Sequence, residues 1–294
     1  MRVFVTGATG FVGTAVVREL LDGGHSVVGL ARSDASAAAL DAAGADVERG
    51  ALDDLDSLRR GAEAADGVIH LAFNHDFSKF AANAAEDARA ITTIGAVLAG
   101  SARPMLVTSG LAHLATDRLA TEDDRPAPSF PRASEAAAAE ARAGGARVGS
   151  VRLAPTTHGA GDHGFVPILI DIARRTGVSA YVDDGAYVWS ATHRADAARV
   201  YRLALEQGAS TEVYHAVAEE ALPFRTIAEA IGQGLGVPVK SIPRETAAEQ
   251  FGWFGMFIGL TIAGSSTRTR ALLGWEPSEP TLLQDLADAD YFAS

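Results

Sequence analysis

The chain has 294 residues, with 25 Lys or Arg, 37 Asp or Glu and no Cys, so its formal net charge is −12. An acidic chain without a basic run repels phosphate backbones, which argues against a nucleic-acid partner. The absence of cysteine excludes disulfides, thiol nucleophiles and Cys-bound zinc. We find no secretory segment at the start and no apolar run of the ~20 residues that span a bilayer, so we expect a cytoplasmic protein without a membrane partner.

The first half of the chain alternates short apolar runs with helical patterns. Strands are expected at residues 2–6, 26–31, 45–49, 67–72, 105–109 and 148–153. Helices are expected between them, at residues 11–21, 35–43, 55–62, 79–99 and 134–142. Such alternation is typical of right-handed βαβ crossovers, and it predicts an α/β fold whose doubly wound parallel sheet is covered on both faces.

After residue 153 the alternation ends. We expect helices at 165–175 and 195–206, strands at 187–192 and 213–217, and then helices separated by prolines. The most apolar stretch, residues 251–263, predicts a buried or interfacial helix, with a flap over a ligand or a homodimer contact as the alternatives. The second half is therefore predicted to be smaller and mainly helical.

A glycine-rich loop joins the first strand to the first helix. It includes Gly7, Thr9, Gly10, Phe11 and Val12, and it ends at a third glycine. Glycine permits the tight turn and the close approach of a pyrophosphate, and the start of the helix supplies free N–H groups and a positive dipole end. Strand, loop and helix follow in the order that dinucleotide binding requires, so this loop predicts a cofactor site.

The end of the second strand indicates which dinucleotide binds. NAD sites place an acid there to accept hydrogen bonds from the ribose hydroxyls. This chain has Arg32 and Ser33 instead, which can clamp and donate to a 2′-phosphate. We therefore expect NADP(H), with NAD(H) as the alternative.

Four segments carry a family resemblance: T-G-A-T-G-F-V-G at 6–13, V-I-H-L-A at 68–72, L-V-T-S at 106–109 and V-R-L-A-P-T-T-H-G at 151–159. With these segments the chain resembles the extended short-chain dehydrogenase/reductases, the epimerase/dehydratase-like group. The resemblance implies a Rossmann-type domain and places Ser109 at the catalytic Ser/Thr position. It also implies the following cofactor contacts: Leu52, Leu71, Ala72, Phe73, Thr108 and Pro155.

The same resemblance leaves one expected motif without a match. The family's proton donor is a Tyr four residues before a Lys, but neither Lys79 nor Lys240 has a tyrosine at that distance. Alignment of the helix start puts Pro131 in the place of the Tyr and Glu135 in the place of the Lys. The chain therefore resembles an atypical member whose acid/base group differs from the standard one.

Histidines cluster where parallel strands end, which is the edge at which ligands bind. His75 and His163 are the leading candidates to replace the tyrosine, because histidine exchanges protons near neutrality and both are expected beside the nicotinamide. A structural role remains the alternative for each. His158, which precedes Asp162 and His163, lies where the family has a supporting tyrosine. The spacing does not match a standard zinc motif, so we expect no metal site.

These patterns lead to a definite functional hypothesis. Residues 1–158 plus about 188–218 are predicted to form the dinucleotide-binding domain, and 159–187 plus 219–294 the substrate-binding region. We expect an NADP(H)-dependent oxidoreductase that acts on a small carbonyl compound. The alternatives are a non-catalytic NADP(H)-sensing protein and an enzyme like the sugar-nucleotide epimerases and dehydratases.

Overall fold

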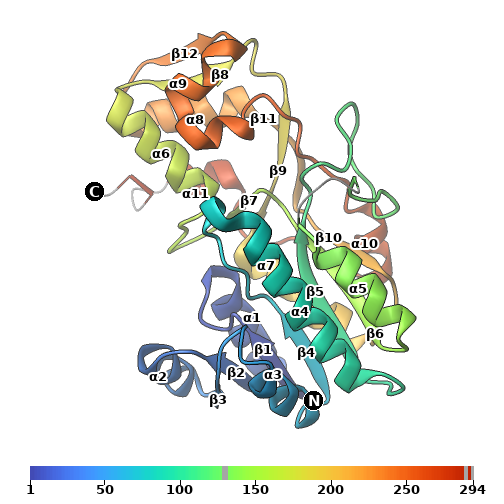
Figure 1. The fold of residues 1–294 in the computed structure, drawn as a ribbon. Helices are drawn as coiled ribbons and strands as arrows, with labels where there is room; N and C mark the ends of the chain where they lie inside the picture. The colour runs from blue at the N-terminus through green and yellow to red at the C-terminus, as the bar shows by residue number, and fades with distance from the viewer. Residues whose placement is uncertain (128–131, 288–290, 293–294) are drawn as a thin grey trace.

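A large parallel sheet forms the centre of the protein in a computed structural model that describes residues 1–127, 132–287 and 291–292. Its seven strands follow the order β10-β6-β5-β4-β1-β2-β3, and every neighbouring pair is parallel (Figure 1). The strands are β1 (Arg2–Thr6), β2 (Ser26–Ala31), β3 (Asp46–Arg49), β4 (Gly67–His70), β5 (Pro104–Gly110), β6 (Arg147–Leu153) and β10 (Val213–Ala216). The strand order reverses direction at β1 and β4, so a crevice is expected beyond their carboxyl ends.

Helices cover both faces of this sheet. One face carries α1 (Phe11–Asp22), α2 (Asp34–Ala43) and α7 (Arg194–Glu206), together with residues after α10 (Thr267–Leu273). The other carries α3 (Leu55–Glu63), α4 (Phe80–Leu98), which follows the short η1 (Phe77–Lys79), and α5 (Ser134–Ala143). The central strand β1 is accordingly buried from its second residue onward. The predicted doubly wound α/β fold is confirmed.

The start of α1 differs from that of its neighbours. Ser33 and Asp54 cap α2 and α3 by accepting hydrogen bonds from the N–H groups of Ser36 and Ser57. Gly10 precedes α1 and provides no side-chain cap. The first-turn N–H groups of a helix need an outside partner, so those of α1 are available to a ligand.

The C-terminal elements gather beyond the large sheet, at the top of Figure 1. They include one sheet of β7 (Thr156–His158), β9 (Val188–His193) and β11 (Glu219–Pro223), and another of β8 (Ser179–Val182) and β12 (Val239–Ile242). The helices there are α6 (Phe165–Thr176), α8 (Phe224–Leu235), η2 (Arg244–Thr246), α9 (Ala247–Phe251), η3 (Gly252–Met256) and α11 (Leu282–Ala287). The region is thus less purely helical than expected, because strands of three to six residues carry too little periodicity to recognise.

The apolar stretch at 251–263 does not form one helix. The chain passes from α9 through η3 into turns, with left-handed backbone at Gly252 and Gly259. Phe254 is fully buried in the C-terminal core, whereas Trp253 and Met256 are 51% and 65% exposed. The glycines explain why this stretch is not one helix, since glycine interrupts helices and permits positive φ. Within the described ranges, no helix combines the length and apolarity needed to cross a membrane.

Candidate functional site

The glycine-rich loop is packed too closely to admit side chains. Gly7 has a φ of +67°, and a Cβ there would lie 2.7 Å from the backbone nitrogen of Ala72. A Cβ on Gly13 would lie 1.9 Å from the carbonyl oxygen of Gly7. Thr9 and Gly10 remain exposed, and Phe11 and Val12 are half-buried. The loop thus presents backbone to the space above α1, and this cradle fits a pyrophosphate.

A buried chain of hydrogen bonds holds this loop to the end of β4. Thr6 Oγ1 lies 2.9 Å from Nδ1 of His70, its partner in strand register, and accepts the N–H of Ala72 at 3.3 Å. His70 Nε2 lies 3.0 Å from Asp87 Oδ1, and the Ser134 hydroxyl donates to Asp87 Oδ2 at 2.5 Å. With Asp87 ionised, His70 donates from Nε2 and accepts the Thr6 hydroxyl at Nδ1. These hydrogen bonds hold in place the segment after β4, which begins with Leu71 and Ala72.

At the expected adenosine end, Arg32 and Ser33 directly follow the second strand, β2. Arg32 is exposed and forms no ion pair within the described residues. Ser33 caps α2, and its carbonyl accepts a 2.6 Å hydrogen bond from Arg49. Arg49 also pairs with Asp34, which neutralises the nearest acid. Arg49 was missed by sequence reasoning, since it ends a different strand; the parallel register brings it beside Ala31. Leu52 follows it and is half-buried.

At the expected nicotinamide end, β5 supplies Thr108 and Ser109. The Thr108 hydroxyl donates to the carbonyl of His70 at 2.9 Å and lies 2.8 Å from the hydroxyl of the buried Tyr201. The Thr108 hydroxyl therefore has its hydrogen-bond partners within the protein. Ser109 is 7% exposed, so a ligand can reach it only through a small opening. Pro155 lies just after β6 and is half-buried, as are Leu71, Ala72 and Phe73.

The rings of the two leading candidates, His75 and His163, make edge-on contacts with aromatic residues of the expected cofactor site. The His75 ring centroid is 5.3 Å from that of Phe73, and the His163 centroid is 5.7 Å from that of Phe11. Both histidines are exposed at the residue level. Even so, the surrounding protein atoms lower the pKa of His75 below its ordinary 6.5, and the charges of Arg132 and His163 act in the same direction. His75 is therefore mostly neutral at pH 7 and releases a proton readily.

His158 and His193 have structural partners instead. The buried His158 places Nδ1 2.6 Å from Asp285 of α11, and His193 Nδ1 accepts the N–H of Ala195 to cap α7. The Tyr291 hydroxyl accepts the N–H of Gly159 at 3.0 Å and donates to Asp162 at 3.1 Å. Burial raises the pKa of Asp162. Through these hydrogen bonds, Tyr291 holds the loop at residues 159–164, which carries His163.

Two arginines join the site that sequence reasoning did not single out. The Arg132 guanidinium lies 4.3 Å from the centroid of the Phe73 ring, and the Arg194 guanidinium lies 5.1 Å from that of Phe11. Arg132 donates from Nη2 to the carbonyl of Thr108 at 3.2 Å and from Nε to Ser134 at 3.1 Å. Two guanidinium groups therefore lie beside aromatic rings of the site, although the whole chain is acidic.

Pro131, expected in the place of the family's tyrosine, lies outside the described residues. Glu135, expected in the place of the lysine, accepts two 2.7 Å hydrogen bonds from Arg152. Arg152 is fully buried and also donates to two backbone carbonyls, so this pair ties α5 to β6. Glu135 therefore has a structural partner of its own.

Aromatic side chains border the loop of His163. Phe165 begins α6 and lies 4.9 Å, between ring centroids, from both Phe254 and Phe257. Phe254 belongs to the core, whereas Phe257 is half-buried and Trp253 is exposed. Phe165 and Phe257 are therefore the members of this aromatic group that are only partly covered by the core.

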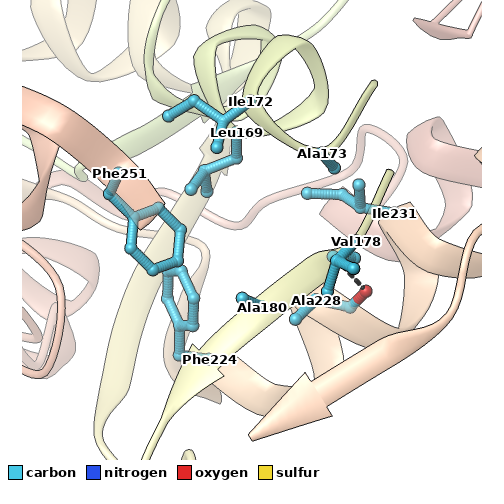
Figure 2. Close-up of a pocket in the computed structure, with 10 residues that line it drawn as sticks. Leu169, Ile172, Ala173, Val178, Ala180, Phe224, Ala228, Ile231 and Phe251 are labelled. Atoms are coloured by element: carbon cyan, nitrogen blue, oxygen red, sulfur yellow. Dashed lines mark hydrogen bonds between the residues drawn. The ribbon is translucent and has the colours of Figure 1, made fainter. Parts of the chain in front are cut away.

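A separate apolar cavity lies among α6, β8 and α8, where apolar side chains converge in Figure 2. Its volume is ≈ 10 Å³, and its lining includes Leu169, Phe224 and Phe251. A cavity of this size holds about one water molecule, so it is not a substrate pocket.

Comparison with known proteins agrees with this geometry. The model of the NAD dependent epimerase/dehydratase family matches residues 3–217. An uncharacterized protein of Schizosaccharomyces pombe is 48% identical over 99% of this chain and 100% of its own length. A 4-hydroxy-2-methyl-3-oxo-4-farnesyl-3,4-dihydroquinoline-1-oxide ketoreductase of Stigmatella aurantiaca is 32% identical, covering 84% of this chain and 78% of its own.

The fold also has a solved counterpart. A dTDP-glucose 4,6-dehydratase of Streptomyces venezuelae, crystallised with NAD, superposes with a TM-score of 0.78 at 21% identity, covering 99% of this chain and 97% of that one. Its likeness concerns the architecture alone. Together, the matched glycine-rich loop, the parallel sheet and the family model show that the chain belongs to the NAD dependent epimerase/dehydratase family.

Proposed function

We propose that the protein is an NADP(H)-dependent oxidoreductase that reduces a small carbonyl compound, with a histidine as its proton donor. The observation that carries this proposal is the position of His75 and His163 on Phe73 and Phe11. These aromatic residues belong to the two segments expected to contact the cofactor. The ketoreductase name of the 32% identical relative supports reduction of a ketone.

The residues around the glycine-rich loop would hold the cofactor. The amides after Gly10 would face the pyrophosphate, and Arg32 and Arg49 would flank a 2′-phosphate beside Ser33. A bound NADPH would supply the hydride. Arg49 already pairs with Asp34, the acid that begins α2, so this carboxylate has a counter-charge beside the expected phosphate.

The remaining chemistry falls to the protein's own side chains. The Ser109 hydroxyl would hold the carbonyl oxygen, and protonated His75 would donate a proton to it. His75 is exposed, so solvent can restore its proton after each turnover. Its lowered pKa makes it a stronger acid than an ordinary histidine, although a smaller fraction is protonated at neutral pH. His163 is the second candidate donor, directly or through water.

Purified protein should therefore oxidise NADPH in the presence of ketones from an aryl and alkyl panel. His75→Gln should lower kcat ~10²–10⁴-fold with a small change in KM, as expected for loss of a general acid. His25→Gln is the matched control, since His25 pairs with Glu206 away from the site and should leave kcat unchanged.

Four results would overturn parts of this proposal. Unchanged turnover in His75→Gln and in His163→Gln would exclude both histidines as donors. Unchanged turnover in Ser109→Ala would exclude the serine. Tight NADPH binding without oxidation by any ketone would favour a sensing protein, whereas conversion of a nucleotide sugar would favour the epimerase-like alternative.

A further inference from the structure

The Arg132 guanidinium lies inside the candidate site, over the ring of Phe73. Within residues 1–127, 132–287 and 291–292 it forms no ion pair, and its Nη1 has no hydrogen-bond partner. The residue is half-buried, and burial of the guanidinium lowers its pKa. A desolvated charge without a partner is costly, so proteins normally pair it.

The acids nearest to Arg132 are already engaged. Asp87 accepts hydrogen bonds from His70 and Ser134, and Glu135 accepts both of its hydrogen bonds from Arg152. Neither carboxylate bonds to Arg132. Arg152 shows the usual arrangement for a buried arginine, a carboxylate that accepts two parallel hydrogen bonds. Arg132 has no such carboxylate among the described residues, which leaves its Nη1 edge for a ligand.

The residues around Arg132 place its guanidinium beside the side chains that are proposed to bind and protonate the carbonyl. Its guanidinium lies over Phe73, the ring that His75 also contacts, and its Nη2 is bonded to the backbone of Thr108, the residue before Ser109. An anionic group bound at Arg132 would therefore lie next to a carbonyl held by Ser109 and His75.

We propose that Arg132 binds a carboxylate adjacent to the reacting carbonyl, so that the substrate class is a 2-oxo acid. This inference rests on the proposed reduction and specifies its substrate. In the reaction, the carbonyl carbon gains a hydride from the reduced dinucleotide, and the carbonyl oxygen gains the proton of His75. The 2-oxo acid becomes a 2-hydroxy acid, the dinucleotide is oxidised, and the carboxylate stays unchanged on Arg132. The half-buried aromatic rings of Phe165 and Phe257 favour an apolar group on the other side of the carbonyl.

Phenylglyoxylate and its methyl ester test this directly, because they share the ring and the ketone and differ in the negative charge. Wild-type protein should reduce the acid with a kcat/KM at least ~10-fold above that of the ester, since a charge-assisted bidentate contact discriminates by this much or more. Arg132→Gln should lose ~10–100-fold with the acid and less than ~3-fold with the ester. Arg132→Lys should fall between the two, because it keeps the charge but loses the fork.

A binding measurement separates this inference from the proposed function. Benzoate, an unreactive carboxylate, should bind the NADPH complex of wild-type protein and should bind the Arg132→Gln complex at least ~10-fold more weakly. The fluorescence of the bound NADPH reports both affinities. Arg225→Gln is the matched control, since Arg225 also lies over an aromatic ring, that of Tyr181, but in the C-terminal region. It should change neither reading.

Two outcomes would overturn the assignment of Arg132. Equal losses with acid and ester would show that it does not read the carboxylate. Weaker NADPH binding in Arg132→Gln would place it in the dinucleotide site instead. Reduction of the ester in preference to the acid would refute the 2-oxo acid class while leaving the proposed reductase intact, whereas absence of NADPH binding in wild-type protein would refute the proposed function itself.

Discussion

Replacing Arg32 with alanine tests the expected preference for NADP(H). Arg32 is exposed, it lies directly after the second strand, and within the described residues it forms no ion pair. Its guanidinium can therefore turn to a 2′-phosphate without losing a partner. The phosphate carries nearly two negative charges at neutral pH, and a guanidinium meets it with two parallel hydrogen bonds.

The size of the effect follows from that exposure. A hydrogen bond to a charged group contributes ~1.5–3 kcal/mol, whereas fully exposed ion pairs contribute ~1 kcal/mol or less. Because Arg32 is exposed, we expect ~1.5–3 kcal/mol for the whole contact rather than for each bond. This corresponds to a ~10–150-fold weaker Kd for NADPH in Arg32→Ala. Arg49 stays bonded to the carbonyl of Ser33, so part of the preference should remain.

Fluorescence titration of NADPH and NADH against both proteins measures this difference. NADH lacks the phosphate, so its Kd should change less than ~2-fold. Arg18→Ala is the control, since Arg18 is exposed on α1 and pairs with Asp22, and it should alter neither cofactor. Added salt should reduce the wild-type preference, because the contact is exposed. Equal losses for the two cofactors, or a wild-type protein that prefers NADH, would refute the reasoning.

Two further predictions concern pH and stability. If His75 donates the proton, kcat should fall as pH rises through a pKa below 6.5, because only the protonated ring can donate. Arg132→Gln removes a charge that repels the protonated ring, so the pH at which kcat falls should move upward. A fall in kcat near pH ~10 would instead point to a tyrosine as the donor. Glu135→Ala leaves the buried Arg152 without its carboxylate and should lower the free energy of unfolding in urea by ~3–5 kcal/mol. Glu229→Ala, which breaks an exposed pair, should cost less than ~1 kcal/mol, and equal losses would contradict this assignment.

Local sequence determined the dinucleotide-binding half of the fold. Strand and helix periods, short connections and the glycine-rich loop each act over a few residues, so their spacing predicts the parallel sheet and the start of α1. The positive φ of Gly7 and the tight packing of Gly13 follow from the same local pattern. Short strands such as β7 and β12 carried no such signal, because their pairing partners lie far away in the chain.

The composition of the site depended on tertiary structure. Sequence reasoning predicted His75 and His163 at the edge where the parallel strands end, but only the fold shows that each ring contacts an aromatic residue of the expected cofactor segments. It also shows that Glu135 is paired with Arg152, which leaves Arg132 without a carboxylate among the described residues. Charge pairing is a contact between residues distant in sequence. No local pattern shows that Arg152 is paired with an acid while Arg132 is not paired with any acid of the described residues.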